Sequence, residues 1–572
     1  MGNATTNVTG RLSASIGALH AVAPQFTCAY DVPNAGVLFA LPALLATGLL
    51  KYTEQFFKLP KGYYGLDSLF LLLAFMALSR VKSIESLRYT APGEWGNIIG
   101  LDRIPEVRTL REKILHLSNE KQAQQWNHEL CHYWMRREPE QAGVLYIDGH
   151  VRVYNGKQTR LPRHYVARQK LCLRATSDYW VNAMDGQPFM VINQVVDPGL
   201  IQVLENEIIP KLDEQVPNQP DKAALKNKAN LHRFTLVFDR EGYSPALFKR
   251  LEKKHIACMT YHKFPKEDWP LEEFQSHTVE LIHGKTTCYQ LAERGTYFQN
   301  EKYWLREVRK LTEQGHQTSI LTSDRCSDVG RISVSMFSRW GQENYFKYMR
   351  EHYNLDRLAS YTVSPINEPI QCINPEYRQI DSQIRSKTGK LNRIMAKYGA
   401  MHMEESLDPD KMERFIQQKA ELQETIELAQ NEINVLKTGR KALDKHVDVN
   451  DLNEEDKFLK LSTQSKYLID GIKMIAYRAE TAMAHCLREF MPHQGEVRRV
   501  LQTLYQADAD IIPDYEQKTL TIQLHHLANK AMDGVIEKMC EELNSTETHF
   551  PRTELKLVLK VGTKQNLRDQ DV

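Results

Sequence analysis

Three acidic residues of this chain could act together in catalysis: Asp148, Asp239 and Glu343. Asp148 closes the apolar run Val144–Ile147, and Asp239 closes a second apolar run, Phe234–Phe238. A carboxylate at the end of a buried strand is held rigidly, and carboxylate oxygens are the ligands that hard divalent cations prefer. In-line cleavage of a phosphodiester uses two such ions, roughly 3.5–4 Å apart. We therefore expect the three carboxylates to bind two Mg²⁺ or Mn²⁺ ions.

Glu343 lies in a segment with helical periodicity. Apolar residues recur at roughly helical spacing from Phe337 to Met349. Arg339, Glu343 and Arg350 are four and seven residues apart, so they share one face of the expected helix. A surface helix with ion pairs would explain this spacing on its own. The two aspartates upstream favour a functional glutamate instead, with Arg339 and Arg350 binding phosphates.

The segments around the two aspartates predict a mixed sheet. Turn signals at Asn155-Gly156 and Asp185-Gly186 separate three expected strands between residues 144 and 192. A helix, the strand that ends at Asp239, a second helix and a further strand follow. Ser244-Pro245 has the residue types of a cap and a first helical position for that second helix. This order of elements is that of an RNase H-like α/β domain.

These motifs resemble those of bacterial insertion-sequence DDE transposases. The helix is similar to the family signature Tyr-x2-Arg-x3-Glu-x6-Lys, which reads Met336, Arg339, Glu343 and Arg350 in this chain. Arg350 keeps the positive charge of lysine but not its geometry, and Met336 lacks the ring of tyrosine. The resemblance covers roughly residues 140–365 and implies metal-dependent strand cleavage and strand transfer at the ends of a mobile element. It implies that the three carboxylates are the catalytic triad.

A basic run begins directly after Asp148. From Gly149 to Ser177 the chain has seven lysines and arginines and no acidic residue. A solvated face is the ordinary explanation of such a run, whereas its place beside a metal ligand favours a track for DNA phosphates. We predict that these residues contact double-stranded DNA: Arg152, Lys157, Arg160, Arg163, Arg168, Lys170 and Arg174.

The C-terminal third has a different pattern. Heptad spacing from Met412 to Leu443 predicts either an antiparallel helical hairpin or a coiled coil between two copies. Because two DNA ends must be held at once, we expect a homodimer when the protein is assembled on DNA.

The predicted fold is multidomain α/β with these parts: an N-terminal helical, DNA-binding domain (1–140); the first part of the RNase H-like catalytic domain (141–262); a β-rich insertion (263–325); the glutamate helix (326–370); the hairpin or coiled coil (378–447); and a small α/β domain (455–572).

Composition indicates a cytoplasmic protein, and the resemblance implies a bacterial one that acts on DNA. The net charge of +2 over 572 residues requires any DNA-binding surface to be local. Nine scattered cysteines without a C-x-x-C pair favour a reducing compartment. Two apolar runs, at residues 35–50 and 66–78, are shorter than a membrane span. We expect them to form a buried helical pair, with no membrane association.

Two other functions remain open. A DNA-binding protein with a catalytically inactive RNase H-like core would carry the same basic run. A zinc hydrolase is the second, because His128 and His132 form an H-E-x-x-H pattern whose histidines would lie on one face of a helix.

Overall fold

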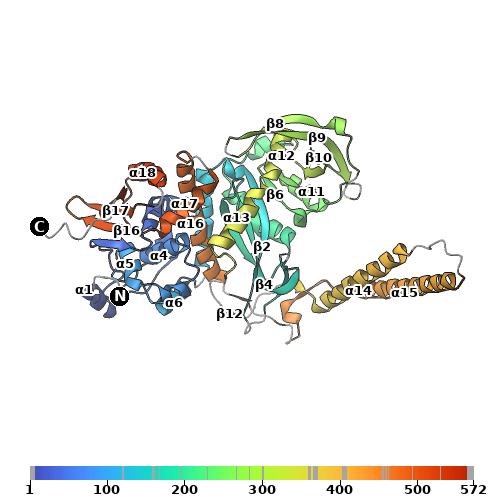
Figure 1. Ribbon diagram of the computed structural model, residues 1–572, viewed down its shortest axis with the longest axis horizontal. Helices are drawn as coiled ribbons and strands as arrows, with labels where there is room; N and C mark the ends of the chain where they lie inside the picture. Colours follow the sequence, from blue (N-terminus) through green and yellow to red (C-terminus); the bar gives the residue numbers. More distant parts are fainter. Residues whose placement is uncertain are drawn as a thin grey trace.

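The structure is a computed structural model. It describes residues 7–562 except 119–120, 157–160, 167, 195, 229, 266, 283, 299, 301, 358–362, 365–370, 402–408, 454–456, 458–459, 462, 492–493 and 528–529. The chain is a mixed α/β protein. Figure 1 shows three regions: a body that contains both ends of the chain, a large sheet beside it, and a helical hairpin that projects from the far side.

A mixed sheet forms the centre of the molecule. In the described part of the chain its strands run in the order β3-β4-β2-β6-β7-β11-β10-β9-β8, and β5 pairs with β4. β2, β6 and β7 are mutually parallel, whereas β4 is antiparallel to both β2 and β5. The strands are β2 (Val144–Val153), β3 (Arg163–Val166), β4 (Leu171–Asn182), β5 (Pro188–Gln194), β6 (Phe234–Phe238), β7 (Ile256–Tyr261), β8 (Gln275–Glu280), β9 (Thr286–Phe298), β10 (Tyr303–Leu311) and β11 (Gln317–Thr322).

Burial explains why the apolar run before Asp239 forms a central strand. All five residues of β6 are buried, as expected for a parallel strand covered on both faces. Ser244 then caps the helix α11, since its Oγ accepts a hydrogen bond from the Leu247 amide at 3.3 Å. The helices around the sheet are α8 (Leu200–Val203), α9 (Ile209–Gln215), α10 (Lys222–Asn227), α11 (Pro245–Lys253), α12 (Val329–Phe337) and α13 (Arg339–His352).

Strands β8 to β11 fall within the segment expected to be an insertion. They form an antiparallel meander, and β11 pairs with β7. The segment therefore lengthens the central sheet instead of forming a separate one.

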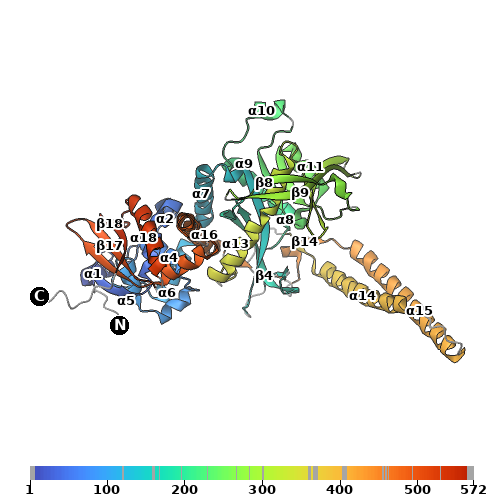
Figure 2. The same cartoon turned by 45° about the horizontal axis from the view of Figure 1, so that its top comes forward.

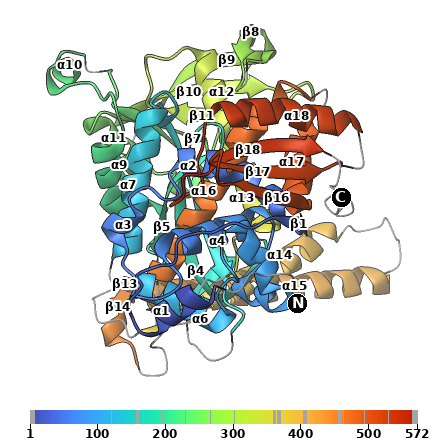
Figure 3. The ribbon, with the colours of Figure 1, turned by 90° about the vertical axis from the view of Figure 1, so that its left-hand side faces the viewer.

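The two ends of the chain share one body. β1 pairs with β16 in the sheet β1-β16-β17-β18, seen beside α17 and α18 in Figure 3. The strands are β1 (Ala29–Val32), β16 (Ala509–Asp514), β17 (Thr519–His525) and β18 (Lys556–Gly562); the helices are α1 (Val8–Ser15), α2 (Leu41–Thr47), α3 (Thr53–Phe56), α4 (Leu66–Leu78), α5 (Pro92–Ile98), α6 (Val107–Leu117), α7 (Gln122–Arg137), α16 (Thr463–Arg488), α17 (Val497–Gln506) and α18 (Lys530–Ser545).

This body differs from the predicted division into residues 1–140 and 455–572. The reason is α4, which is apolar on all sides and has nine buried residues, so it must be enclosed from every direction. α16 from the C-terminal part packs on α4, α2 and α7 and supplies part of that enclosure. Among the described helices, none combines the length and apolarity needed to cross a membrane.

A hairpin of two long helices, α14 (Pro375–Ala400) and α15 (Pro409–Lys441), projects from the sheet region (Figures 1 and 2). Residues of the heptad pattern face α14 within the same chain: Ile380, Ile384 and Leu391 of α14 pack with Ile426, Ala429, Ile433 and Leu436 of α15. Short strand pairs, β12 (Val363–Ser364) with β15 (Lys460–Leu461) and β13 (Gln371–Ile373) with β14 (His446–Asp448), lie near its base.

Candidate active site

Strand register places Asp148, within β2, beside Asp239, which directly follows β6. β2 and β6 are parallel neighbours, and Ile147 pairs with Phe238. Asp148 and Asp239 follow these paired residues, so they occupy equivalent positions on adjacent strands. Each carboxylate accepts a hydrogen bond from the next backbone amide, Asp148 from Gly149 at 2.9 Å and Asp239 from Arg240 at 2.7 Å.

Gln342 fixes the helix that carries Glu343. Its buried side-chain amide donates to the Tyr146 carbonyl at 3.1 Å and to the Asn182 side chain at 2.9 Å. These partners lie on β2 and β4, so α13 is held across the two strands in one register. Glu343 is the next residue on α13, and its charge contributes to raising the pKa of Asp148.

A close backbone approach also fixes the start of α13. Gly186, in the turn between β4 and β5, has φ +88°, and a Cβ built there would lie 2.6 Å from the Gly341 carbonyl oxygen. Only glycine combines this conformation with this approach. The signature position Met336 is fully buried in a cluster with Tyr146 and Val237, so here it is a core residue.

Arg339 lies among the three carboxylates. Its guanidinium forms an ion pair with Glu343, and its Nη1 is 3.9 Å from Asp239 Oδ2. The positive charge of Arg339 also lowers the pKa of Asp148. Burial and the charges of Asp239 and Glu343 raise that pKa by more. The structure adds this pairing with Glu343 to the predicted role of Arg339 in binding phosphates.

The site is short of positive charge. Burial, together with the charges of Asp239 and Glu343, raises the pKa of Asp148 to about 6. Burial, Asp197 and Asp148 raise the pKa of Glu241 to about 7. A carboxylate whose ionisation is opposed by like charges is stabilised by a nearby cation. Carboxylate oxygens of Asp148, Asp239 and Glu343 do not all lie within 4.8 Å of one another in the described structure, so it is the charge of the site, and not a preformed ligand cluster, that favours divalent ions. Glu241 was not predicted, and its place two residues after Asp239 was the only available signal.

Asp197 forms a hydrogen-bonded group beside this cluster. Its carboxylate accepts from the Tyr179 hydroxyl at 2.6 Å, the Gly199 amide at 2.9 Å and the Ser177 hydroxyl at 3.2 Å. Burial raises its pKa, but hydrogen bonds from His164 and Tyr179 outweigh burial and bring it to about 2. Asp197 is therefore a fixed negative charge at physiological pH.

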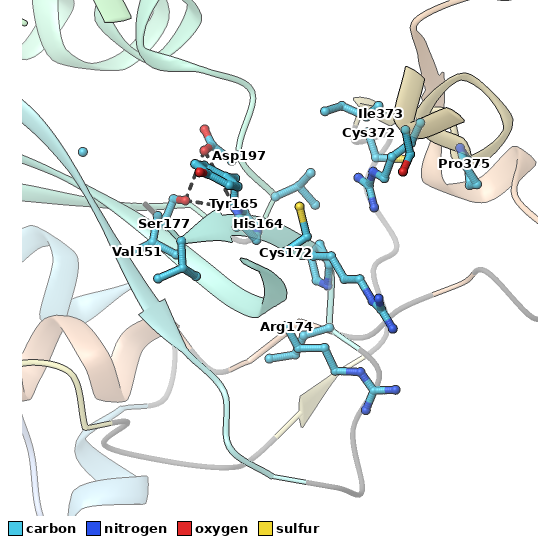
Figure 4. Close-up of a pocket in the computed structure, with 18 of the residues that line it drawn as sticks. Val151, His164, Tyr165, Cys172, Arg174, Ser177, Asp197, Cys372, Ile373 and Pro375 are labelled. Atoms are coloured by element: carbon cyan, nitrogen blue, oxygen red, sulfur yellow. Dashed lines mark hydrogen bonds and ion pairs between the residues drawn. The ribbon is translucent and has the colours of Figure 1, made fainter. Parts of the chain in front are cut away.

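A cavity of about 1170 Å³ extends from Asp148 and Glu241 along the β3–β4 hairpin. Figure 4 shows the hairpin residues, including Arg174, on one side and Cys372, Ile373 and Pro375 on the other. The cavity is acidic where the carboxylates lie, and its other walls include arginines: Arg163, Arg168, Arg174 and Arg378.

Comparison with known families decides the identity of the chain. A family model described as "Transposase protein" matches residues 2–563. The chain belongs to this transposase family. Enzymes of this kind cleave and join DNA, so DNA is the substrate. No curated protein matches the chain.

The basic run of the transposase divides into exposed and buried residues. Arg163 and Lys170 are exposed, and Arg174 is half-buried on the cavity wall. Arg168 pairs with Asp356 at 3.1 Å. Lys157 and Arg160 lie outside the described residues. Arg350 is half-buried, and its Nε donates to the carbonyl of Phe346 at 3.2 Å.

Arg152 corrects the prediction of a continuous DNA track. It is 1% exposed and pairs with Asp178 of β4 and with Asp470 of α16 at 2.7 Å. Alternate side chains of a strand face opposite sides of a sheet, and Arg152 is on the side covered by α16. It cannot reach a DNA backbone from this position.

The H-E-x-x-H segment lies on α7 and does not form a metal site in the described part of the chain. Gln215 Nε2 is 2.7 Å from His128 Nδ1, and Glu214 is 3.8 Å from the other ring nitrogen. Groups of three potential ligands within 4.8 Å of one another occur elsewhere, at His232, Asp324 and Cys326 and at Asp31, Asp510 and His525. Neither His128 nor His132 belongs to one, and neither do Asp148, Asp239 and Glu343.

The raised pKa of Asp148 predicts a pH-dependent cost in stability. Without metal, the folded state binds the Asp148 proton more tightly than the unfolded state does, so this residue destabilises the transposase as pH rises from about 4 through 6. A shift of about two units corresponds to roughly 3 kcal/mol. In EDTA at pH 8, Asp148→Asn should raise the unfolding midpoint, and the difference from wild type should vanish near pH 4. A difference independent of pH would contradict this origin.

Proposed function

We propose that this transposase is a DDE enzyme in which Asp148, Asp239 and Glu343 bind two Mg²⁺ or Mn²⁺ ions. It would cleave the strand at the end of a mobile element and join that end to target DNA. The observation that carries this proposal is the register of β2 and β6, which places Asp148 and Asp239 side by side. α13 carries Glu343, and Arg339 of the same helix pairs with Glu343 and lies 3.9 Å from Asp239.

The strand order supports an RNase H-like catalytic core. β5, β4 and β2 are antiparallel neighbours, and β6 and β7 continue the sheet parallel to β2. The order expected from the sequence is three strands, helix, strand, helix, strand; the structure has this order with an additional short strand, β3, and additional short helices before β6. β2 and β6 adjoin, with Asp148 within β2 and Asp239 directly after β6.

We assign the following roles to individual residues. Asp148, Asp239 and Glu343 would hold the ions, and the charge of Asp148 interacts with those of both other carboxylates. When bound, the ions supply positive charge that polarises the phosphodiester and lowers the pKa of the attacking water. Gln342 keeps α13 in register. Arg339 balances Glu343 and, with Arg350, is proposed to bind phosphates of the DNA.

Activity in the presence of defined metals tests this proposal. Purified protein is expected to nick duplex DNA that carries the element end in Mg²⁺ or Mn²⁺, and to be inactive in EDTA. Activity restored by Zn²⁺ alone would favour a hydrolase at His128 and His132. Absence of nicking with every metal, with DNA binding retained, would favour an inactive DNA-binding protein.

We also propose that the enzyme acts as a homodimer assembled on DNA, since two ends must be joined to one target. Much of the apolar seam of α15 is covered by α14 of the same chain, at Ile384 and Leu391. The contact between copies is therefore expected on another surface.

The exposed part of the basic run gives a further prediction. Arg163→Gln combined with Lys170→Gln should weaken DNA binding evenly across sequences, because phosphate contacts carry no sequence information. The slope of log affinity against log salt should fall by about 1.8, at 0.9 per lost phosphate contact. Anisotropy titrations at several salt concentrations measure this slope, and an unchanged slope would mean that the two residues form only a solvated face.

A further inference from the structure

One face of α14 is basic along its whole length. At about 100° per residue, Ile380, Ile384 and Leu391 point toward α15, where they are packed. The opposite side, within about 140° of arc, has five basic residues, which we call the α14 basic face: Arg378, Arg385, Lys390, Arg393 and Lys397.

The charge of α14 is not balanced by its surroundings. α14 has six basic residues, and its only acidic residues are Glu376 and Asp381, both near its start. α15, by contrast, has six basic and six acidic residues. An ordinary solvated helix mixes the two signs as α15 does. The separation of charge within one hairpin therefore requires an explanation specific to α14.

The residues of the α14 basic face are exposed. Arg385 is 80% exposed in its side chain and pairs with Asp381 at 2.9 Å. Within the part of the chain that the structure describes, the other four members form no salt bridge, and Arg393 donates only to the Gly389 carbonyl at 3.2 Å. Four guanidinium or ammonium groups are thus available to an anionic partner.

The position of α14 identifies that partner. Pro375, Arg378, Gln379 and Ser382, on its first turns, line the cavity that also contains Asp148. Figure 4 shows Pro375 across the cavity from the β3–β4 hairpin. The α14 basic face therefore begins at the wall of the proposed active site and continues outward along the projecting hairpin (Figure 2).

We propose that the α14 basic face binds the backbone of duplex DNA adjoining the cleaved phosphodiester and guides it along the hairpin. This inference rests on the proposed function, because it takes the Asp148 cavity as the place where DNA is cut. The dimensions agree with a duplex. A helix of 26 residues is about 39 Å long at 1.5 Å per residue. That length matches about 11 base pairs at 3.4 Å each.

Two charge-matched variants test the proposal. Arg385→Gln, Arg393→Gln and Lys397→Gln together remove three charges from the α14 basic face. The control removes three exposed charges from α15, by Arg414→Gln, Lys437→Gln and Lys441→Gln. Binding is measured in EDTA on a duplex that extends about 12 base pairs or more beyond the element end on both sides, and on a duplex truncated close to the cleavage site.

The α14 variant should show a salt slope about 2.7 smaller than wild type on the long duplex. Wild type then loses about 40-fold more affinity than the variant between 50 and 200 mM salt. On the truncated duplex the two proteins should bind alike, and the α15 control should match wild type on both. Equal loss in the α15 control, or an unchanged slope in the α14 variant, would overturn the proposal.

These outcomes separate this inference from the proposed catalytic function. Binding in EDTA needs no metal and no triad, so the α14 effect can be present in a protein that cleaves nothing. In that case the DDE assignment is wrong and the α14 DNA-binding surface is supported. Conversely, normal metal-dependent cleavage without an α14 effect on long duplexes would support the DDE assignment and contradict the α14 surface. Equal melting temperatures of both variants and wild type show that loss of binding is not loss of folding.

Discussion

Asp148→Asn, Asp239→Asn and Glu343→Gln are each expected to reduce strand cleavage by about 10³-fold or more, as for removal of a group that stabilises transition-state charge. Each substitution preserves the shape of the side chain and removes one negative charge from the proposed metal site. Binding to an element end should remain within about twofold of wild type, because phosphate contacts dominate affinity. The proposed contacts lie on the β3–β4 hairpin and α14. A gel assay of nicking in Mg²⁺, with anisotropy on the same duplex, measures both.

Glu129→Gln is the matched control for this series. It also replaces a carboxylate by its amide, but on α7 within the H-E-x-x-H segment. We expect cleavage at the wild-type rate, because α7 packs against α16, β5 and α9 and His128 Nδ1 is already 2.7 Å from Gln215 Nε2. Loss of cleavage in Glu129→Gln, or near-normal cleavage in any of the three triad variants, would show that the assigned carboxylates are not the active site.

The placement of the triad aspartates could be predicted because it depends on local patterns. Short apolar runs that end in a carboxylate specify buried strands, and the order of strands and helices specifies which strands adjoin. β2 and β6 carry this information within their own residues, and the structure pairs them in parallel. Helical spacing around Glu343 similarly predicted α13, which begins at Arg339.

Contacts between distant parts of the chain could not be predicted in this way. Asp31 of β1 donates its backbone amide to Asp510 of β16, 479 positions later, and no local pattern encodes that pairing. For the same reason, local sequence patterns predict separate N-terminal and C-terminal parts. The apolar character of α4 showed only that something must cover it, not that α16 would.

The role of Gln342 was missed for a related reason. A glutamine in an amphipathic helix is usually solvated, and the sequence gives no sign that this one is 1% exposed. The Gln342 side chain fixes the position of α13 by donating to backbone carbonyls of β2 and β4, which are brought together only once the sheet has formed. Polar residues that set a register are visible in the structure and not in the pattern of polarity.

The second prediction concerns Arg152. A role in contacting DNA and a role in a buried ion-pair network predict opposite effects of its removal on stability and on DNA binding. A residue of a DNA track would lower DNA affinity when removed and leave stability unchanged. In the structure, Arg152 belongs to a buried network with Asp178, Asp470 and Lys466 that joins β2 and β4 to α16. Its removal leaves two buried aspartates facing one lysine.

We therefore expect Arg152→Met to lower the free energy of unfolding by about 3–5 kcal/mol, the cost of breaking a buried ion pair by removing one partner. Methionine fills much of the volume of arginine, so the loss reports on charge more than on packing. Arg163→Met, an exposed residue of the same run, is the matched control and should change stability by less than about 0.5 kcal/mol. Urea unfolding followed by tryptophan fluorescence measures both.

Because Arg152 is on the same strand as Asp148, four residues away, its loss should also impair cleavage at temperatures where the protein remains folded. An Arg152→Met protein that is as stable as wild type but binds DNA more weakly would contradict this prediction. It would show that Arg152 contacts DNA and does not stabilise the packing of α16 on the central sheet.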